Sequence, residues 1–173
     1  MNHEQLKFPT GRFTPPESYN AEAIAGWIND VKDLPFKLRE TAAKLNNAHL
    51  DTPYRPDGWT ARQVIHHLAD SHTQAITRFK WALTEDNPTI KAYDQNGWAQ
   101  LPDSKLEIEP SLKMIDGIHE RLIAIVETFT EADWNRTFIH PETGITYTLF
   151  RTIATYAWHG KHHLAHLRLV IGN

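Results

Sequence analysis

Apolar side chains recur every three or four positions in four stretches of the chain, and this spacing is typical of amphipathic helices. The four stretches cover about residues 20–45, 60–84, 110–129 and 149–171. In the first, Pro35 is expected to kink or split the helix, because proline lacks the N–H that an interior turn requires. In the second, Thr60 and Gln63 form a capping-box pattern that predicts a helix start. Four such helices predict an all-α protein with a four-helix bundle.

The segments between these stretches predict three further features. Residues 1–19 contain Pro and Gly but no helical period, so they are expected to form an irregular N-terminal arm. Residues 137–147 hold two short β-prone runs around a Pro/Gly turn, which predicts a small hairpin before the last helix. Residues 87–109 form a long connection that carries Tyr93 and Trp98, and we expect it to close over a substrate as a lid.

Composition narrows the class of protein. The chain has 173 residues, the size of one domain, so residues 1–173 are expected to form a single domain. Its formal net charge is −3 without a basic run, which argues against nucleic acid or an anionic membrane as a partner. No apolar run approaches the length of a membrane span. Cysteine is absent, which excludes disulfides, thiolate zinc sites and a cysteine nucleophile, and a cytoplasmic location fits.

Histidine is the unusual residue, with 11 in the chain. His159 and His163 lie four positions apart in the last helical stretch, so their side chains share one face. A second pair, His66 and His67, lies in the second stretch. Two ligands from one helix and one from another would make a three-histidine metal site. Such a site leaves one coordination position open for water or substrate, which is the catalytic rather than the structural arrangement.

The helical period predicts which histidines of the last helix face inward. His163 lies roughly 60° and His159 roughly 100° from the apolar direction, so both flank the core. His166 lies roughly 120° away. His162, roughly 160° away, is expected to point to solvent or to a partner subunit.

In the second helix the same test favours His67, roughly 110° from the apolar centre, over His66, roughly 150° away. His72 lies roughly 30° from that centre, so it is either a competing ligand or a core histidine with a hydrogen-bond partner. Asp70 could orient an imidazole from behind, although an exposed charge is its commoner role. An isolated helical histidine is most often structural, and only the convergence of several favours a metal.

Several spaced motifs together resemble a known family. Residues 51–72 (DTPYRPDGWTARQVIHHLADSH) resemble the signature of YfiT-like proteins in the DinB/YfiT-like superfamily. Residues 140–142 (HPE) and 158–166 (WHGKHHLAH) match further parts of that pattern. The resemblance runs from about residue 8 to the C-terminus. Gly160 and Lys161 depart from the more histidine-rich spacer of close relatives, but neither is an expected ligand.

The resemblance implies a four-helix bundle with up-down-down-up connectivity and a metal site made of His67, His159 and His163, which would serve catalysis through the metal. It also implies one divalent metal ion per chain, zinc or alternatively nickel, and a cytoplasmic homodimer. Family members are linked to two activities: metal-dependent hydrolysis, and transfer of a thiol such as bacillithiol to an electrophile.

Three functions therefore remain open at the level of sequence. In a thiol S-transferase the metal would stabilise the thiolate of a small thiol, and this is the hypothesis that we favour. In a hydrolase it would lower the pKa of bound water to about 7 and produce a hydroxide nucleophile. His66, Asp70 and His72 are the nearest candidates for a general base, and none stands out. In a non-catalytic interaction module, His72 would complete a closed four-histidine cage that serves stability.

Overall fold

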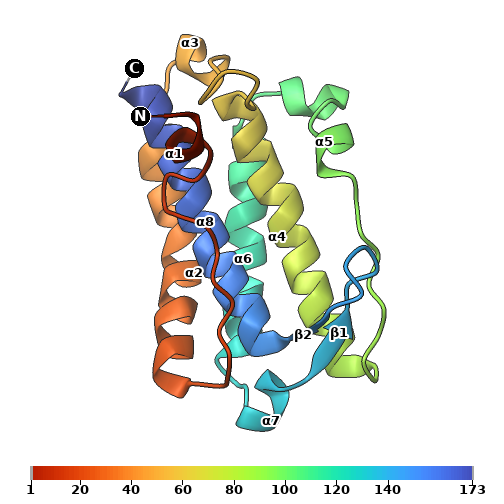
Figure 1. Cartoon of the computed structure of the whole chain (residues 1–173). Helices are drawn as coiled ribbons and strands as arrows, with labels where there is room; N and C mark the ends of the chain where they lie inside the picture. The colour runs from red at the N-terminus through yellow and green to blue at the C-terminus, as the bar shows by residue number, and fades with distance from the viewer. Residues whose placement is uncertain (1, 173) are drawn as a thin grey trace.

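Four long helices form the body of the computed structural model, which describes residues 2–172. They are α2 (Ala21–Ala42), α4 (Ala61–Thr84), α6 (Glu109–Val126) and α8 (Leu149–Ile171). In Figure 1, α2 and α8 run in one direction and α4 and α6 in the other, which confirms the expected up-down-down-up bundle. Because α4 and α6 are parallel neighbours, the connection between them returns along the length of the bundle.

The four apolar stripes meet in the core of this bundle. Helix α2 packs against α6 and α8, and α4 packs against the same two helices. Large side chains from all four helices are fully buried there: Leu38, Ile65, Phe79, Ile115, Leu122 and Ile153. Gly160 allows α8 to approach α2 closely, since a Cβ at this position would lie 2.7 Å from Leu34 Cδ2. This contact holds α8 close to α2 next to the histidines of α8.

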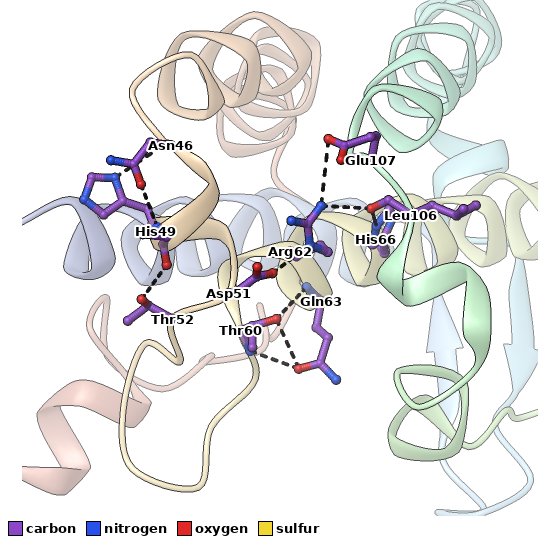
Figure 2. Close-up of polar contacts among 11 residues, drawn as sticks. Asn46, His49, Asp51, Thr52, Thr60, Arg62, Gln63, His66, Leu106 and Glu107 are labelled. Carbon is purple, nitrogen blue, oxygen red and sulfur yellow. Dashed lines mark hydrogen bonds and ion pairs between the residues drawn. The ribbon is translucent and has the colours of Figure 1, made fainter.

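The start of α4 is held by a capping box and by one arginine. The Thr60 hydroxyl accepts from the Gln63 N–H at 3.2 Å, and Gln63 Oε1 accepts from the Thr60 N–H at 3.0 Å. Figure 2 shows Arg62 beside them, where Nε bonds Asp51 at 2.9 Å and Nη1 bonds the Leu106 carbonyl at 3.0 Å. The predicted helix start is therefore confirmed, and it is tied to the segments before α4 and before α6.

The predicted hairpin is also confirmed. Strands β1 (Thr137–Ile139) and β2 (Thr146–Thr148) pair antiparallel, with Phe138 opposite Tyr147. The long connection joins this hairpin, because the Ile90 N–H donates to the Ile139 carbonyl at 3.0 Å. Four short elements lie in the connections between the long helices: α3 (Asn47–Leu50), α5 (Gln95–Trp98), the 3-10 turn η1 (Pro102–Lys105) and α7 (Glu131–Trp134).

Two expectations need correction. Pro35 was expected to kink or split α2, and the helix is not split there, because the rest of its apolar face is packed in the core. The N-terminal arm is not irregular throughout, since Asn2 caps a short helix, α1 (His3–Lys7), through a complete capping box. None of the helices within residues 2–172 carries an apolar stretch long enough to span a bilayer.

Candidate metal centre

The bundle brings three histidines from two helices to one point. His67 comes from α4, and His159 and His163 come from successive turns of α8. One ring nitrogen of each lies within 4.8 Å of the others, and Nε2 of His67 is 3.1 Å from Nε2 of His159. Two nitrogens bound to one tetrahedral zinc ion lie about 3.3 Å apart. We call these residues the three-histidine cluster, and its spacing is compatible with such an ion.

The surroundings of the cluster keep its imidazoles neutral. His67 and His163 are only 5% and 7% exposed, and the Trp59 ring lies against them with centroids 4.6 and 6.4 Å away. Burial is the main cause that lowers the pKa of His67 to about 4, with a smaller contribution from His162. Burial and the neighbouring imidazoles also hold the pKa of His159 and His163 well below the ordinary value. Neutral imidazole is the form that offers a lone pair to a metal.

A chain of hydrogen bonds behind His159 fixes its tautomer. His119 Nδ1 lies 2.7 Å from the Val31 carbonyl oxygen, which can only accept, so Nδ1 carries the proton. His119 Nε2 then accepts from His72 Nδ1 at 2.9 Å, and His72 Nε2 accepts from His159 Nδ1 at 3.3 Å. Burial lowers the pKa of His119 to about 4 and that of His72 well below its usual value, so both rings are neutral. We call this chain the inner relay, and it leaves the lone pair of His159 on Nε2.

A second chain acts in the same way on His163. His166 Nε2 lies 3.3 Å from the Lys7 carbonyl oxygen and donates to it. His166 Nδ1 therefore accepts from His163 Nδ1 at 3.3 Å, which leaves the lone pair of His163 on Nε2. Burial is the main cause that lowers the pKa of His166 to about 3, and the Tyr54 ring stacks on it at 3.8 Å. We call this chain the outer relay, because it ends in the N-terminal arm.

The Val31 carbonyl is available to the inner relay for a reason that lies in the sequence. In an α-helix the carbonyl of residue 31 would accept from the N–H of residue 35. Residue 35 is proline and has no N–H, so the carbonyl accepts a hydrogen bond from the His119 Nδ1–H instead. The proline that was expected to kink or split α2 therefore leaves the Val31 carbonyl available as an acceptor inside the bundle.

The other histidine candidates of α4 have different roles. His66 is not part of the cluster, and Figure 2 shows it next to Leu106. Its Nε2 donates to the Leu106 carbonyl at 3.2 Å and its Nδ1 accepts from the Ser111 hydroxyl at 2.7 Å. His72 is a core histidine, fully buried, that lies behind His159 rather than beside the cluster. Asp70 makes no hydrogen bond to an imidazole within residues 2–172, and burial raises its pKa to about 6.

The expectation that His162 faces solvent or a partner subunit is wrong. His162 is 7% and His166 is 1% exposed, because the N-terminal arm runs along this side of α8 (Figure 1). The Trp158 indole donates to the Gly11 carbonyl at 3.1 Å and stacks on His162 at 4.5 Å. A helical period describes the faces of one helix, and it carries no information about a distant segment that covers them.

Two pockets meet at the cluster. The arm-side pocket, of about 500 Å³, is bordered by all three cluster histidines and by Trp59 and Tyr54. The hairpin-side pocket, of about 460 Å³, is bordered by a different set: Ser71, Arg78, Tyr93, His140, Tyr156 and His159. His159 and Gln95 line both pockets, so the two are adjacent.

The long connection supplies part of both walls. Gln95 of α5 lines each pocket, and Tyr93 lines the hairpin-side pocket. Trp98 is 37% exposed and lies against Tyr93, with ring centroids 4.6 Å apart. Movement of this connection as a lid stays a prediction, in which Trp98 would support Tyr93 from outside the pocket.

Sequence reasoning did not single out His119 or Arg78 for a role at the site. His119 lies four residues after Ile115 and three before Leu122, so it shares the buried face of α6. A histidine in an apolar stripe was therefore the available signal. Arg78 carried no such signal, because its position next to the site depends on the hairpin and on α8.

Comparison with known proteins gives a consistent result. The model of the DinB superfamily matches residues 12–167. A protein of Bacillus mycoides (strain KBAB4), named "Putative metal-dependent hydrolase", is 47% identical to this chain. The match covers 95% of this chain and 94% of the relative. A protein of Bacillus cereus (strain G9842) with the same designation is 48% identical over 94% and 93%.

A solved structure is similar over nearly its whole length. It is YfiT from Bacillus subtilis, described as "a probable metal-dependent hydrolase with an unusual four-helix bundle topology". The two chains share 40% identity and superpose with a TM-score of 0.93, over 96% of this chain and 95% of that one. The bundle architecture is therefore shared with an experimentally determined relative.

Proposed function

The chain belongs to the DinB superfamily, and from this premise we propose that it is a metal-dependent enzyme whose three-histidine cluster holds one divalent ion, most simply zinc. The observation that carries the proposal is the convergence of three neutral ring nitrogens of His67, His159 and His163 within 4.8 Å. No carboxylate joins this group within residues 2–172. Three imidazoles suit zinc, and nickel is the alternative that the same donors accept.

The proposal of an enzyme, rather than a metal-stabilised module, rests on the surroundings of the cluster. A structural site closes four protein ligands around the ion, whereas a catalytic site has three. His72, the fourth ligand of the closed alternative, directs Nε2 to His159 Nδ1 and Nδ1 to His119. The arm-side pocket borders all three cluster histidines and provides room for a small molecule beside them.

We propose thiol S-transfer as the reaction. A bound divalent ion lowers the pKa of a coordinated thiol or water and so supplies a nucleophile at neutral pH. In S-transfer the thiol would lose its proton to solvent, its sulfur would attack an electrophilic carbon to form a C–S bond, and the leaving group would depart with its electron pair. This reaction needs little acid–base assistance from the protein, and that agrees with the lack of a carboxylate in the cluster. The imidazoles next to it, His72 and His166, are already engaged in the two relays.

Hydrolysis is the second candidate, and the names of the relatives favour it. Two relatives that are 47% and 48% identical are both designated metal-dependent hydrolases. A hydrolase would use water as the nucleophile in the same arm-side pocket and would need a group that moves its proton. Asp57 is the one carboxylate among the residues that line this pocket in the described part of the chain, and it is exposed.

The first experiment measures the metal content of the purified protein and of a His159→Ala/His163→Ala variant. We expect about one metal ion per chain in the wild type and almost none in the variant. His162→Ala is the matched control, because His162 lies on the same helix but outside the cluster, and it should keep the metal. A wild-type protein without stoichiometric metal would remove the proposal.

The second experiment separates the two reactions. The protein is loaded with cobalt and a small thiol such as 2-mercaptoethanol is added. A thiolate-to-cobalt charge-transfer band, together with conversion of an alkyl halide by that thiol, would support S-transfer. A cobalt spectrum that thiols leave unchanged, together with turnover of an ester, would assign the protein as a hydrolase instead.

A further inference from the structure

The hairpin-side pocket contains a cation that makes no direct ion pair within the described chain. Arg78 of α4 lines this pocket, yet it forms no ion pair within 4.0 Å among the described residues 2–172. Its side chain is half-buried. Removing a guanidinium from water without a paired anion is costly, so such a group is normally neutralised by a carboxylate or retained for a ligand.

The contacts of Arg78 leave most of its donors unused. Nη1 donates to the Tyr156 hydroxyl at 3.2 Å, which is a neutral partner. Nε is buried and has no partner within the described chain, and no hydrogen bond is formed there by Nη2. Guanidinium presents its donors as a planar fork that matches the two oxygens of a carboxylate. Tyr156 thus orients a guanidinium whose Nε and Nη2 donors have no partner in the described chain.

Other polar groups of the same pocket point to the same type of ligand. His140, from the hairpin turn after β1, has a buried Nδ1 without a partner in the described chain. Tyr93, from the long connection, adds a phenol whose pKa burial raises to about 12, so it stays a hydrogen-bond donor. Three separate segments thus place hydrogen-bonding groups around one cavity of about 460 Å³.

The pocket is close enough to the cluster for one molecule to reach both. His159 lines the hairpin-side and the arm-side pocket, and so does Gln95. A small molecule with its reacting atom at the cluster can therefore extend an anionic group towards Arg78.

We propose that Arg78 and the hairpin-side pocket form a subsite for a carboxylate group of the small substrate that reacts at the three-histidine cluster. The link to the reacting atom rests on the proposed function, whereas the anion subsite itself rests on Arg78 and its unused donors. The charges around the pocket favour a single negative charge over a phosphate dianion. Glu142 and Asp94 also line it and repel any anion, and this repulsion is about twice as large for a dianion.

The test compares two thiols of similar size on the cobalt-loaded protein. The charge-transfer band reports the affinity for 3-mercaptopropionate and for 3-mercapto-1-propanol, which lacks the carboxylate. We expect the wild type to bind the carboxylate at least about tenfold more tightly, the gain of a charge-assisted hydrogen-bond pair. In Arg78→Gln this ratio should fall to about one, and Arg78→Lys should retain part of it because the charge stays but the fork is lost.

Arg151→Gln is the matched control. Arg151 also has a buried Nε without a partner in the described chain, but its guanidinium stacks on Tyr147 at 4.3 Å and does not line the pocket. This variant removes the same charge and should keep the tenfold ratio. Equal affinities in the wild type, or an equal loss of the ratio in both variants, would overturn the subsite. The cobalt spectrum of each variant without thiol verifies that the cluster is intact.

A further measurement separates failure of the subsite from failure of the thiol reaction. If neither thiol changes the cobalt spectrum, thiol S-transfer is rejected, but the anion subsite is still open to a direct test. Propionate is then titrated into the zinc-loaded protein while the Arg78 Nε–H resonance is followed by NMR. A saturable shift with propionate and none with propionamide supports the subsite, and the absence of any shift overturns it.

Discussion

The inner and the outer relay perform the same task with different parts of the molecule. The inner relay links His159 of α8 to His72 of α4, His119 of α6 and the Val31 carbonyl of α2, so it crosses all four helices of the bundle. His72 and His119 are 0% and 2% exposed. The hydrogen bonds that orient His159 should therefore open only when the core of the bundle unfolds.

The outer relay depends on a segment that the bundle does not enclose. It links His163 through His166 to the Lys7 carbonyl at the end of α1, a helix of five residues with no buried side chain. Segments with few buried apolar contacts open at low free energy. His159 and His163, the two proposed ligands that lie one turn apart on α8, thus take their orientation from the most stable and from one of the least stable parts of the structure.

Among the variants that test this difference between the relays, His119→Leu should have the largest effect. The variant leaves the Val31 carbonyl and the His72 Nδ1–H without partners in the core. We expect a loss of about 3 kcal/mol of unfolding free energy, since each buried unpaired group costs about 1–3 kcal/mol. Metal affinity should fall about 10- to 100-fold, the usual effect of removing a group that orients a ligand. Urea unfolding and a competition titration with a zinc chelator measure the two effects.

His166→Leu is the matched change in the outer relay. Lys7 is exposed, so its carbonyl can turn to water when the imidazole is removed, and only the His163 Nδ1–H is left without its acceptor. We expect a loss of about 1 kcal/mol of unfolding free energy, because one group rather than two is left unpaired. Metal affinity should fall only a few-fold, because local opening of the arm lets water replace the lost acceptor. Equal losses in the two variants would show that the arm is as firmly fixed as the core, and the distinction between the relays would be wrong.

The sequence predicts the ligand face of this centre but not the relays behind it. Periodicity within α4 and α8 favours His67 over His66 and places His159 and His163 on one face, because each choice concerns one helix, but it leaves His72 open as a competitor. The partners of His159 depend on which faces of α4 and α6 meet, and a single sequence does not contain that information. The burial of His162 was missed for the same reason, because a segment about 150 residues away covers it. Pro35 was expected to kink or split α2, and the packed faces of α2 on both sides of it keep the helix from splitting.

Acid provides the second comparison of the two relays in the metal-free protein. Burial lowers the pKa of His119 from 6.5 to about 4, so the folded state keeps this ring neutral while the unfolded chain takes up a proton. Its share of stability is therefore complete above pH 6.5 and is lost as the pH falls from 6.5 to about 4. That share is about 3 kcal/mol over the interval. Urea unfolding between pH 7 and 4.5 should show this slope in the wild type and a smaller one in His119→Leu.

The outer relay should respond differently to the same acid. The pKa of His166 is lowered to about 3 while the arm is docked, mainly by burial. If the arm opens locally, His166 can take up a proton while the bundle remains folded. His166 should thus titrate in NMR spectra of the folded protein, whereas His119 should not titrate before global unfolding. Simultaneous titration of both rings would contradict the proposed difference in local stability.

The smallest expected effect tests the origin of the inner relay. Pro35→Ala restores an N–H that can donate to the Val31 carbonyl, so His119 must share its acceptor. We expect metal affinity to fall only about threefold, because a carbonyl has two lone pairs. The free energy of unfolding should rise by about 1–2 kcal/mol, since proline costs about 3 kcal/mol in a helix interior and part of that is offset by the freer unfolded chain.

Phe36→Ala, at a neighbouring position that is 67% exposed, is the control for a change in the same turn of α2. Opposite signs for stability and metal affinity distinguish this variant from His119→Leu, in which both decrease. An unchanged affinity would show that His119 does not depend on the carbonyl that the proline leaves free.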